Sequence, residues 1–485
     1  IELFVRLNKY STGISLVSSA IALIVVIKIY GRDMNSAMKM PWMILIMAFP
    51  VAGVGIYLLC GHSGVNIGIR KHFQALQSEL TPLLPDKEDI LQKMSDEDRQ
   101  TANMAHYISH SAGYPVYDNT DLEFYPEAVD GFEAQKEALK QAKKFIFMEY
   151  HAIEDAQSFA GMKSILFEKA KEGVEVRLIY DDMGCVTTLP HRYYKKLQAK
   201  GIKCAAFNPV RPILNIVLNN RDHRKILVID GHTGYTGGIN LADEYINEEI
   251  RFGHWKDTGI RLYGEGVWNL TVMFLQMWSI ITGVRTHIPA YSPYVFHTEE
   301  FESDGFVQPY GDSPMDNETV GENVYLNIIS QAKKYVFICT PYLIIDNEMM
   351  MALCLAAKKG VDVRIITPGI PDKKMVFLLT QSYYKQLIEA GVRVYEYTPG
   401  FVHSKTFVCD DEIATVGTIN LDYRSLYLHF ECGVWMYQSQ AVREAKEDME
   451  ATLPKCKEVS LDFCNKINIF VRGIQSIMRL IAPLL

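Results

Sequence analysis

Two long apolar runs open the chain. Residues 11–27 are uncharged and largely apolar, and residues 41–60 form a second run without a charged side chain. At about 1.5 Å of rise per residue, each run in helical form can roughly span a bilayer core of about 30 Å. The polar connection of residues 31–40 is short, so we predict a transmembrane helical hairpin. A signal peptide and a buried helical pair are the alternatives.

The charges near this hairpin do not decide its orientation. Arg6 and Lys9 lie outside it, whereas Lys28, Arg32 and Lys39 lie inside it. Because orientation follows the side richer in basic residues, these opposing sets leave the topology open.

Four regions follow from the pattern along the chain. The apolar hairpin accounts for residues 1–64, and the polar, highly charged residues 65–118 predict a solvated helical connector. Beyond them, short apolar strands alternate with amphipathic helices, which is the pattern of an α/β domain with a largely buried sheet. Because the alternation occurs twice, we expect two homologous α/β domains, 119–300 and 301–485, the second ending in an amphipathic tail.

Short matching segments relate these two domains. The same order of strand, helix and glycine recurs in both, with related sequences at corresponding places. The matched pairs are residues 142–147 with 332–337, 172–179 with 359–366, and 193–197 with 383–387. Two such domains, fused and facing each other, are the expected architecture.

Composition narrows the functional classes. The 485 residues can hold two domains of common size and a smaller appendage. The net charge of −8 argues against a nucleic-acid-binding protein, which usually carries a basic surface. The nine cysteines are scattered without a CxxC pair, so we expect reduced and mostly buried thiols.

The strongest match between the domains is a set of polar residues. His223, Lys225 and Asp230 recur as His403, Lys405 and Asp410 with identical spacing. Side chains two apart on a strand share a face, so each domain presents an imidazole beside an ammonium group. Each aspartate lies an odd number of residues from its lysine, and the first precedes a glycine at a hairpin turn, so this position indicates a structural role.

Further polar positions recur after this motif. Asn240 and Asn420 return to the strand ends, where their amides can donate to a phosphate oxygen. Asp257 and Glu431 occupy matching positions later in each domain. Each carboxylate can hold one nitrogen of an imidazole and thereby select its tautomer and orientation.

Together these groups suit phosphoryl transfer by in-line displacement. One histidine can attack phosphorus while the other protonates the leaving oxygen. The lysines and asparagines can neutralise the non-bridging oxygens, so we predict neither a metal nor a cofactor. A purely structural duplication is one alternative. A zinc site built from the histidines is another, which the charge of the neighbouring lysines opposes.

These residues resemble the phospholipase D superfamily and, within it, the bacterial cardiolipin synthases. The resemblance covers essentially the whole chain. Besides the paired motif, it rests on residues 254–257 (HWKD), 340–343 (TPYL), 421–431 (LDYRSLYLHFE) and 479–485 (RLIAPLL), and on Trp42, Pro50 and residues 57–61 of the hairpin. Gly238 stands where many relatives have serine, so the first copy departs from the family pattern there.

The resemblance implies two phospholipase D-like domains that synthesise cardiolipin. One phosphatidylglycerol would transfer its phosphatidyl group to a histidine with release of glycerol, and a second phosphatidylglycerol would accept it. The resemblance assigns His223 as the nucleophile and His403 as the acid and base, and it counts Asp230 and Asp410 with the catalytic motif. The implied setting is the bacterial inner membrane, with a cytoplasmic catalytic body, anionic lipids as partners and an open oligomeric state.

Other functions would use the same residues. A phospholipase D-type hydrolase would discharge the intermediate with water, and another phosphatidyltransferase would use a different donor or acceptor lipid. The hairpin and the net charge disfavour a nuclease of the superfamily. Two intact motifs disfavour a non-catalytic membrane scaffold that binds anionic lipid.

Two apolar segments each have two interpretations. Residues 209–218 form either a core strand or a segment that dips into the bilayer beside the site. Residues 467–485 space isoleucines at a helical period, which predicts either a packed helix or an amphipathic helix at an anionic membrane surface.

Overall fold

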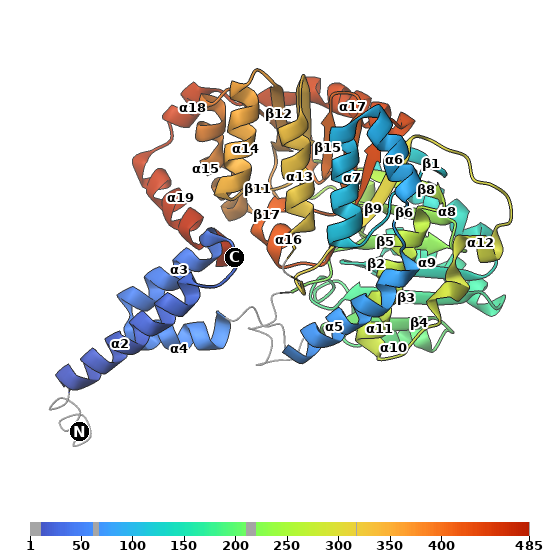
Figure 1. The fold of residues 1–485 in the computed structure, drawn as a ribbon, viewed down its shortest axis with the longest axis horizontal. Coiled ribbons are helices and arrows are strands. Elements are labelled where there is room, and N and C mark those ends of the chain that lie inside the picture. The colour runs from blue at the N-terminus through green and yellow to red at the C-terminus, as the bar shows by residue number, and fades with distance from the viewer. Residues whose placement is uncertain (1–10, 62–66, 210–219, 317, 485) are drawn as a thin grey trace. The chain divides into compact units, whose positions relative to one another are not determined.

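A computed structural model describes residues 11–61, 67–209, 220–316 and 318–484. The chain divides into two compact units (Figure 1). The first unit combines residues 1–66, 211–220 and 468–485, and the second combines residues 67–210 and 221–467. The first and the last helices of the described chain therefore belong to the same unit.

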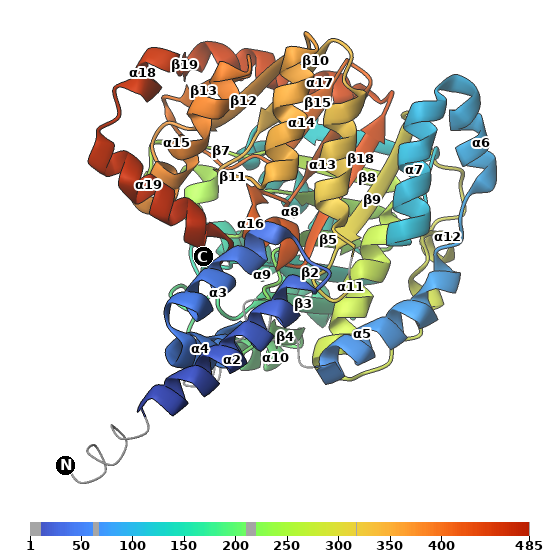
Figure 2. The ribbon, with the colours of Figure 1, turned by 60° about the vertical axis from the view of Figure 1, so that its left-hand side comes forward.

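The apolar runs near the N-terminus form three helices instead of two. They are α2 (Ser11–Tyr30), α3 (Ser36–Ala48) and α4 (Pro50–Cys60), each in contact with the other two (Figure 2). The second run, predicted as one helix, is divided at Phe49 because Pro50 has no N–H to continue a helix and instead begins the next one. In the described part of the chain, no helix is both long enough and apolar enough to cross a membrane.

The end of the chain completes this unit. Helix α19 (Ile469–Ile481) and the short helix η6 (Ala482–Leu484) contact α3. One face of α19 is buried through Gln475 and Met478. The apolar side chains left exposed on α19 include Ile469, Phe470, Ile474 and Ile477. The segment thus forms a helix with one face packed and an apolar face exposed, and its contact with a membrane stays a prediction.

The first domain of the second unit is built on a seven-stranded sheet. Its strands are β1 (Thr120–Tyr125), β2 (Phe145–Tyr150), β3 (Glu175–Asp181), β4 (Lys203–Phe207), β5 (Lys225–Ile229), β6 (Thr233–Gly237) and β8 (Gly259–Gly264). Their spatial order is β1-β8-β6-β5-β2-β3-β4, with β2, β3 and β4 parallel to one another. The main helices are α8 (Ala128–Gln141), α9 (Gln157–Lys171), α10 (Tyr193–Gln198) and α11 (Val267–Thr282).

The second domain is built on an eight-stranded sheet. Its strands are β9 (Phe306–Asp312), β10 (Tyr335–Cys339), β12 (Asp362–Pro368), β13 (Arg393–Tyr397), β15 (Thr406–Cys409), β16 (Ile413–Gly417), β18 (Glu431–Tyr437) and β19 (Cys456–Glu458). Their order is β19-β13-β12-β10-β15-β16-β18-β9. The main helices are α13 (Val320–Gln331), α14 (Asn347–Lys358), α15 (Lys374–Glu389) and α17 (Gln440–Thr452).

The two sheets share one strand order. Strands β1, β8, β6, β5, β2, β3 and β4 occupy the same places as β9, β18, β16, β15, β10, β12 and β13, and β19 adds one edge strand. Central strands such as β2 and β5 are buried along their whole length, as nearly continuous apolar runs predict. The prediction of two homologous α/β domains is confirmed.

The predicted connector is helical but packs against both domains. Its helices are α5 (Ile67–Leu80), η1 (Thr81–Leu83), α6 (Glu88–Glu97) and α7 (Arg99–Ala112). Helix α5 contacts α11, and α7 contacts β9 and α13, beside which it lies in Figure 1. Met94 and Ala105 are completely buried. The expectation of a solvated connector is therefore corrected, because each helix carries an apolar face that the charged residues conceal in the sequence.

Short elements complete the second unit. Two small parallel ladders pair β7 (His254–Lys256) with β14 (Gly400–Val402), and β11 (Leu343–Ile344) with β17 (Leu421–Asp422). The short helices are η3 (Asp243–Ile246), η4 (Ile288–Tyr291), α12 (Pro293–Phe296), α16 (Tyr423–Tyr427), η5 (Leu453–Lys455) and α18 (Leu461–Asn465). The ladder of β7 and β14 matters most here, because it joins the two domains.

Two remaining expectations concern cysteines and one apolar segment. The eight cysteines whose side chains are described are free thiols, and all but Cys456 are buried. Residues 210–219, most of the segment with the two interpretations above, lie outside the described residues.

Candidate active site

Strand pairing between the domains brings each motif histidine beside a carboxylate of the other domain. In the ladder of β14 and β7, Val402 pairs with Lys256, so the next residues, His403 and Asp257, lie side by side. The backbone N–H of His403 donates to the Lys256 carbonyl at 2.7 Å. The register of one short ladder therefore determines one half of the site.

The other half repeats this arrangement with the domains exchanged. A parallel bridge pairs Asp222 with Phe430, and the next residues are His223 and Glu431. The backbone N–H of His223 donates to the Phe430 carbonyl at 2.9 Å. Each of the two motif histidines is thus held by a carboxylate of the other domain.

Both histidines use the same ring nitrogen for this contact. Nδ1 of His223 lies 2.9 Å from each carboxylate oxygen of Glu431, and Nδ1 of His403 lies 2.7 Å from Oδ2 of Asp257. Both carboxylates are fully buried. Because a carboxylate only accepts hydrogen bonds, Nδ1 donates, and the lone pair of each neutral imidazole lies on Nε2.

Burial lowers the pKa of both imidazoles. The pKa of His223 falls well below its usual value, first through burial and then through the charges of Lys225 and nearby imidazoles. Burial and Lys405 lower the pKa of His403 to about 4, and Asp257 opposes this shift. Both rings are therefore neutral at physiological pH in the free protein.

The motif lysines lie beside the histidines at the start of their strands. The ammonium of Lys225 donates to the carbonyl of His223 at 2.5 Å, and that of Lys405 donates to the carbonyl of His403. Lys405 Nζ also lies 2.8 Å from Nδ1 of His403. Burial lowers the pKa of Lys225 to about 8 and that of Lys405 to about 7.

The motif aspartates lie at the opposite ends of these strands. Asp230 accepts hydrogen bonds from the backbone N–H groups of residues 143–145 at 2.8 to 2.9 Å. Asp410 accepts from residues 333–335 at 2.6 to 2.8 Å. Each aspartate anchors the turn before the central strand of its sheet. Asp230 and Asp410 thus bind backbone N–H groups at a turn, whereas the resemblance counts them with the catalytic motif.

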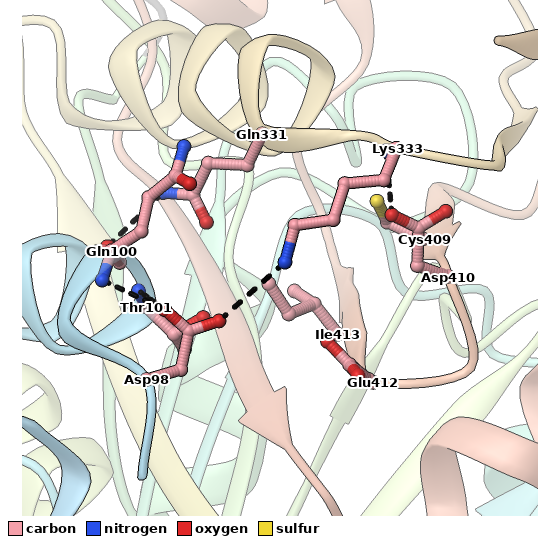
Figure 3. A pocket seen from close by; sticks show the side chains of 9 residues that line it. All are labelled: Asp98, Gln100, Thr101, Gln331, Lys333, Cys409, Asp410, Glu412 and Ile413. Carbon is pink, nitrogen blue, oxygen red and sulfur yellow. Dashed lines mark hydrogen bonds and ion pairs between the residues drawn. The ribbon is translucent and has the colours of Figure 1, made fainter. Parts of the chain in front are cut away.

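A small pocket lies beside Asp410. It lies where the turn after β15 meets α7 and the end of α13 (Figure 3). Its volume of about 10 Å³ is close to that of one water-sized probe. Its lining includes Asp98, Lys333 and Asp410.

The two asparagines support neighbouring side chains. Asn240 accepts from the backbone N–H of Ala152 and donates to the hydroxyl of Tyr245 at 2.7 Å. The ring of Tyr245 lies edge-on to His403, with centroids 5.2 Å apart. Asn420 donates to the hydroxyl of Ser425 at 3.1 Å. A direct contact of either amide with phosphate stays a prediction.

Two histidines at the site were not singled out from the sequence. The ring centroid of His151 lies 4.8 Å from that of His223, and its Nδ1 lies 2.9 Å from the Asp222 carbonyl. The ring centroid of His429 lies 5.7 Å from that of His223. Its sequence signal was present, because His429 precedes Glu431 by two residues, as Trp255 precedes Asp257.

The carboxylates have different supports. Thr418 donates a hydrogen bond to Oε2 of Glu431. Gly238 holds the matching position in the first domain, and a Cβ there would lie 2.0 Å from Oδ1 of Asp257. The departure at Gly238 thus has a physical reason, because Asp257 occupies the space that a side chain would need.

Comparisons with known proteins show the family of the chain. The family model "cardiolipin synthase, PLD-like domain" matches residues 136–252 and 325–453, and the model "phospholipase D-nuclease N-terminal" matches residues 18–62. The chain is 45% identical to an uncharacterized protein of Streptococcus mutans, over 95% of this chain and 99% of that protein. It is 34% identical to cardiolipin synthase 2 of Bacillus anthracis, over 94% and 88% of the two chains.

A solved structure shares the fold. The crystal structure of phosphatidylserine synthase from Haemophilus influenzae superposes with a TM-score of 0.59 at 15% identity, covering 79% of this chain and 97% of that one.

Proposed function

The chain belongs to the cardiolipin synthase family of phospholipase D-like proteins, and we propose that it joins two phosphatidylglycerol molecules into cardiolipin and glycerol through a phosphohistidine. The observation that carries this proposal is the pair of buried histidines, each held through Nδ1 by a carboxylate of the other domain. Two such imidazoles offer their Nε2 atoms as a nucleophile and an acid on either side of one phosphate.

The first step breaks the bond between phosphorus and the glycerol head group. Nε2 of neutral His223 attacks phosphorus, and a P–N bond forms as the P–O bond to glycerol breaks. His403, which takes up a proton on Nε2 when the anionic phosphate binds, gives that proton to the leaving glycerol oxygen and becomes neutral. The products are free glycerol and a phosphatidyl group on His223.

The second step reverses the roles of the acid and base. His403, now neutral, takes a proton from a hydroxyl of the second phosphatidylglycerol. That oxygen attacks phosphorus, the P–N bond breaks, and cardiolipin leaves with His223 restored. The ammonium groups of Lys225 and Lys405 neutralise the non-bridging oxygens in both steps.

Different surroundings of the histidines support this assignment of roles. Burial and cationic or imidazole neighbours all lower the pKa of His223, which favours the neutral form that a nucleophile needs. Asp257 opposes the lowering of the pKa of His403, which favours the imidazolium that a general acid needs. A bound phosphate adds negative charge and favours the imidazolium further.

We also propose that the first unit holds the enzyme on the bacterial inner membrane, with α2 as one arm of the hairpin and α3 with α4 as the other. A surface rich in apolar side chains supports this, because soluble proteins rarely expose large apolar patches. The exposed apolar side chains include Leu16, Val17, Ile21, Leu23, Ile24, Ile27, Met47, Phe49, Val51, Leu58 and Leu59. The free thiols agree with a cytoplasmic catalytic body.

Product analysis tests the reaction. The full-length protein is incubated with vesicles of phosphatidylglycerol labelled in its glycerol head group. Cardiolipin with an equal amount of free glycerol is the expected result. Phosphatidic acid with glycerol would mean hydrolysis, product only after adding another lipid would mean a different donor or acceptor, and no turnover would support a lipid-binding scaffold.

Vesicle flotation tests the membrane proposal. The double substitution Leu58→Lys and Leu59→Lys adds two charges to an exposed apolar surface and should reduce flotation with phosphatidylglycerol vesicles. The matched control is Gln157→Lys with Ser164→Lys, which adds the same two charges at exposed positions of α9 in the second unit. Equal flotation of both variants would contradict the proposal.

A further inference from the structure

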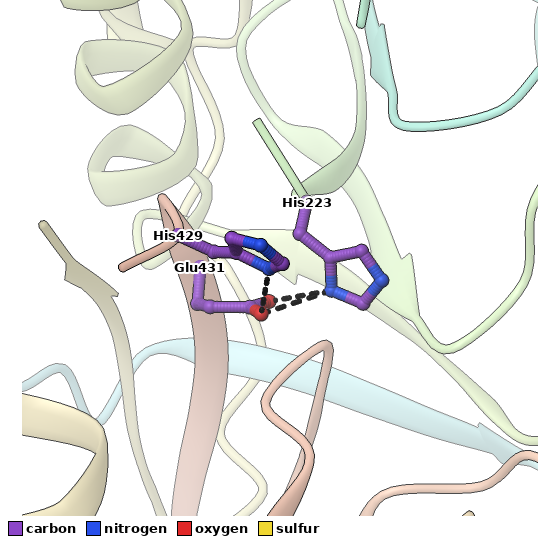
Figure 4. A group of neighbouring side chains, drawn as sticks. All are labelled: His223, His429 and Glu431. Atoms are coloured by element: carbon purple, nitrogen blue, oxygen red, sulfur yellow. Dashed lines mark hydrogen bonds and ion pairs between the residues drawn. The ribbon is translucent and has the colours of Figure 1, made fainter. Parts of the chain in front are cut away.

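A group of metal-ligating side chains lies beside the proposed nucleophile. The ring nitrogens of His223 and His429 and a carboxylate oxygen of Glu431 all lie within 4.8 Å of one another. Figure 4 shows the Glu431 carboxylate in contact with both rings, at 2.9 Å to His223 and 3.8 Å to His429. Four-coordinate zinc with bonds of about 2.0 Å keeps its ligands roughly 3.3 Å apart, so His429 would move toward the other two ligands, and His223 and Glu431 would separate slightly, when the ion binds.

His429 has no role in packing that would explain an imidazole. Among the described residues, neither ring nitrogen has a hydrogen-bond partner, although His429 is only 9% exposed. A buried polar group without a partner is costly, and a bound ligand removes that cost. The matching residue of the first domain, Trp255, packs on His403 and offers no nitrogen lone pair.

The charge of Lys225 opposes a cation beside His223, as it opposes protonation of that ring. The ammonium of Lys225 donates to the carbonyl of His223, whereas the three ligand atoms belong to side chains. The Glu431 carboxylate also supplies a negative charge at the centre of the group. Two imidazoles and one carboxylate form a ligand set that zinc uses in enzymes, with a fourth position left for water or a substrate oxygen.

We propose that His223, His429 and Glu431 form a site for a divalent transition-metal ion such as Zn²⁺, and that the bound ion inhibits the enzyme. The ion takes the place of the proton that Nδ1 of His223 donates to Glu431. A neutral imidazole that binds metal through Nδ1 carries its one proton on Nε2. The proton thus moves from Nδ1 to Nε2, and the lone pair required for attack on phosphorus is lost.

The inhibition rests on the proposed role of His223, whereas binding of the ion does not. The first experiment therefore measures binding alone. Cobalt is added to the full-length, EDTA-treated protein in detergent, and visible absorption reports four-coordinate Co²⁺. His429→Phe removes one ligand, and His151→Phe removes a neighbouring imidazole outside the group. We expect wild-type absorption from the His151 variant and affinity weaker by about 100-fold or more from the His429 variant, since loss of even an outer-shell partner costs about 10–100-fold.

The second experiment measures cardiolipin formation with and without Zn²⁺. Each variant is compared with its own zinc-free rate, so a change in basal rate does not enter. We expect zinc to inhibit the wild-type protein and the His151 variant, EDTA to restore activity, and the His429 variant to need about 100-fold more zinc. His429→Gln serves in place of His429→Phe if that variant does not fold.

The possible results distinguish failure of the metal site from failure of the proposed function. Cobalt binding that is equal in wild type and both His429 variants, or absent from all, would overturn the metal site whatever the enzyme makes. Cobalt binding without inhibition by zinc in an active cardiolipin synthase would overturn the inhibitory role. A protein that makes no cardiolipin but binds cobalt through His429 would leave the site established and remove the proposed function.

Discussion

The two halves of the active site have the same backbone arrangement but different neighbouring side chains. Each histidine follows a parallel pairing between the domains and meets a carboxylate of the other domain. Around His223, however, lie the imidazoles of His151 and His429, whereas Tyr245 and Trp255 lie around His403. The duplicated fold supplies two equivalent places for a histidine, and the neighbours make the two histidines chemically different.

The carboxylates extend this difference. Glu431 is supported by the hydroxyl of Thr418, while Asp257 fills the space beside Gly238 that a side chain would need. Asp257 and Gly238 thus form one matched pair, and Glu431 and Thr418 form the other. Substitutions in one half should therefore not have the effects of the same substitutions in the other.

The largest expected effects come from removing the histidines. His223→Ala should abolish the phosphatidyl-enzyme, because no nucleophile remains. His403→Ala should lower turnover by about 10⁴-fold through loss of the general acid and base. With a donor whose leaving group needs no proton, the His403 variant should still form the adduct slowly and discharge it poorly.

Mass spectrometry of quenched reactions measures this difference. An acid-labile phosphatidyl adduct on His403 in the His223 variant would reverse the assignment of roles.

The next largest effects are expected from the two carboxylates, each of which holds the histidine of the other domain. Glu431→Gln should impair adduct formation by His223, and Asp257→Asn should impair protonation by His403, each by about 100-fold through a disturbed tautomer. Donors with good and poor leaving groups distinguish the two. Asp257→Asn should lose most of its effect with a good leaving group, and Glu431→Gln should keep it. The opposite pattern would mean that each carboxylate acts on the other histidine.

The lysines should give the two halves different pH dependences. Each ammonium must be protonated to hold the phosphate, and the pKa values of Lys405 and Lys225 are lowered to about 7 and about 8. The ratio kcat/KM should therefore fall as pH rises through this range, by up to about tenfold per pH unit for each group. Lys405→Arg should move the first fall toward pH 8, and Lys225→Arg should leave it near 7. A profile flat to pH 9 in the wild type would contradict the lowered pKa values.

The smallest expected effects concern the supports of the carboxylates. Gly238→Ser should lower activity by about tenfold, because its Cβ displaces the Asp257 carboxylate from His403. Thr418→Ser keeps the hydroxyl that supports Glu431 and should change activity little, whereas Thr418→Ala should cost more. Steady-state rates on phosphatidylglycerol vesicles provide the measurement. An active Gly238→Ser variant would mean that Asp257 can move without loss.

Several features could be predicted from the chain alone. Strand and helix alternation and the matched segments predicted two α/β domains, because periodic burial and a duplicated sequence are local signals. Identical spacing in the two motifs predicts that His223 lies beside Lys225 and His403 beside Lys405, since residues two apart on a strand share a face. The aspartates were assigned a structural position from the same periodicity, and the backbone contacts of Asp230 and Asp410 agree with it.

Other features needed contacts between distant residues. The packing of the connector is one of them. Charged residues alternate with the apolar ones along its sequence, so the buried face of each helix becomes evident only when the helix packs against the domains. The place of His429 beside His223 could not be predicted, because its spacing from Glu431 becomes informative only when the register of Asp222 with Phe430 is known.

The amino-acid sequence by itself determined which reacting groups the protein contains and on which face of a strand each lies, because strand periodicity acts over a few residues. Only the tertiary structure decided which carboxylate holds which histidine. His223 and Glu431 are separated by the length of a domain along the chain, as are Asp257 and His403. Their pairing depends on the register of one short ladder and one isolated bridge between the domains, and packing of the whole interface sets that register.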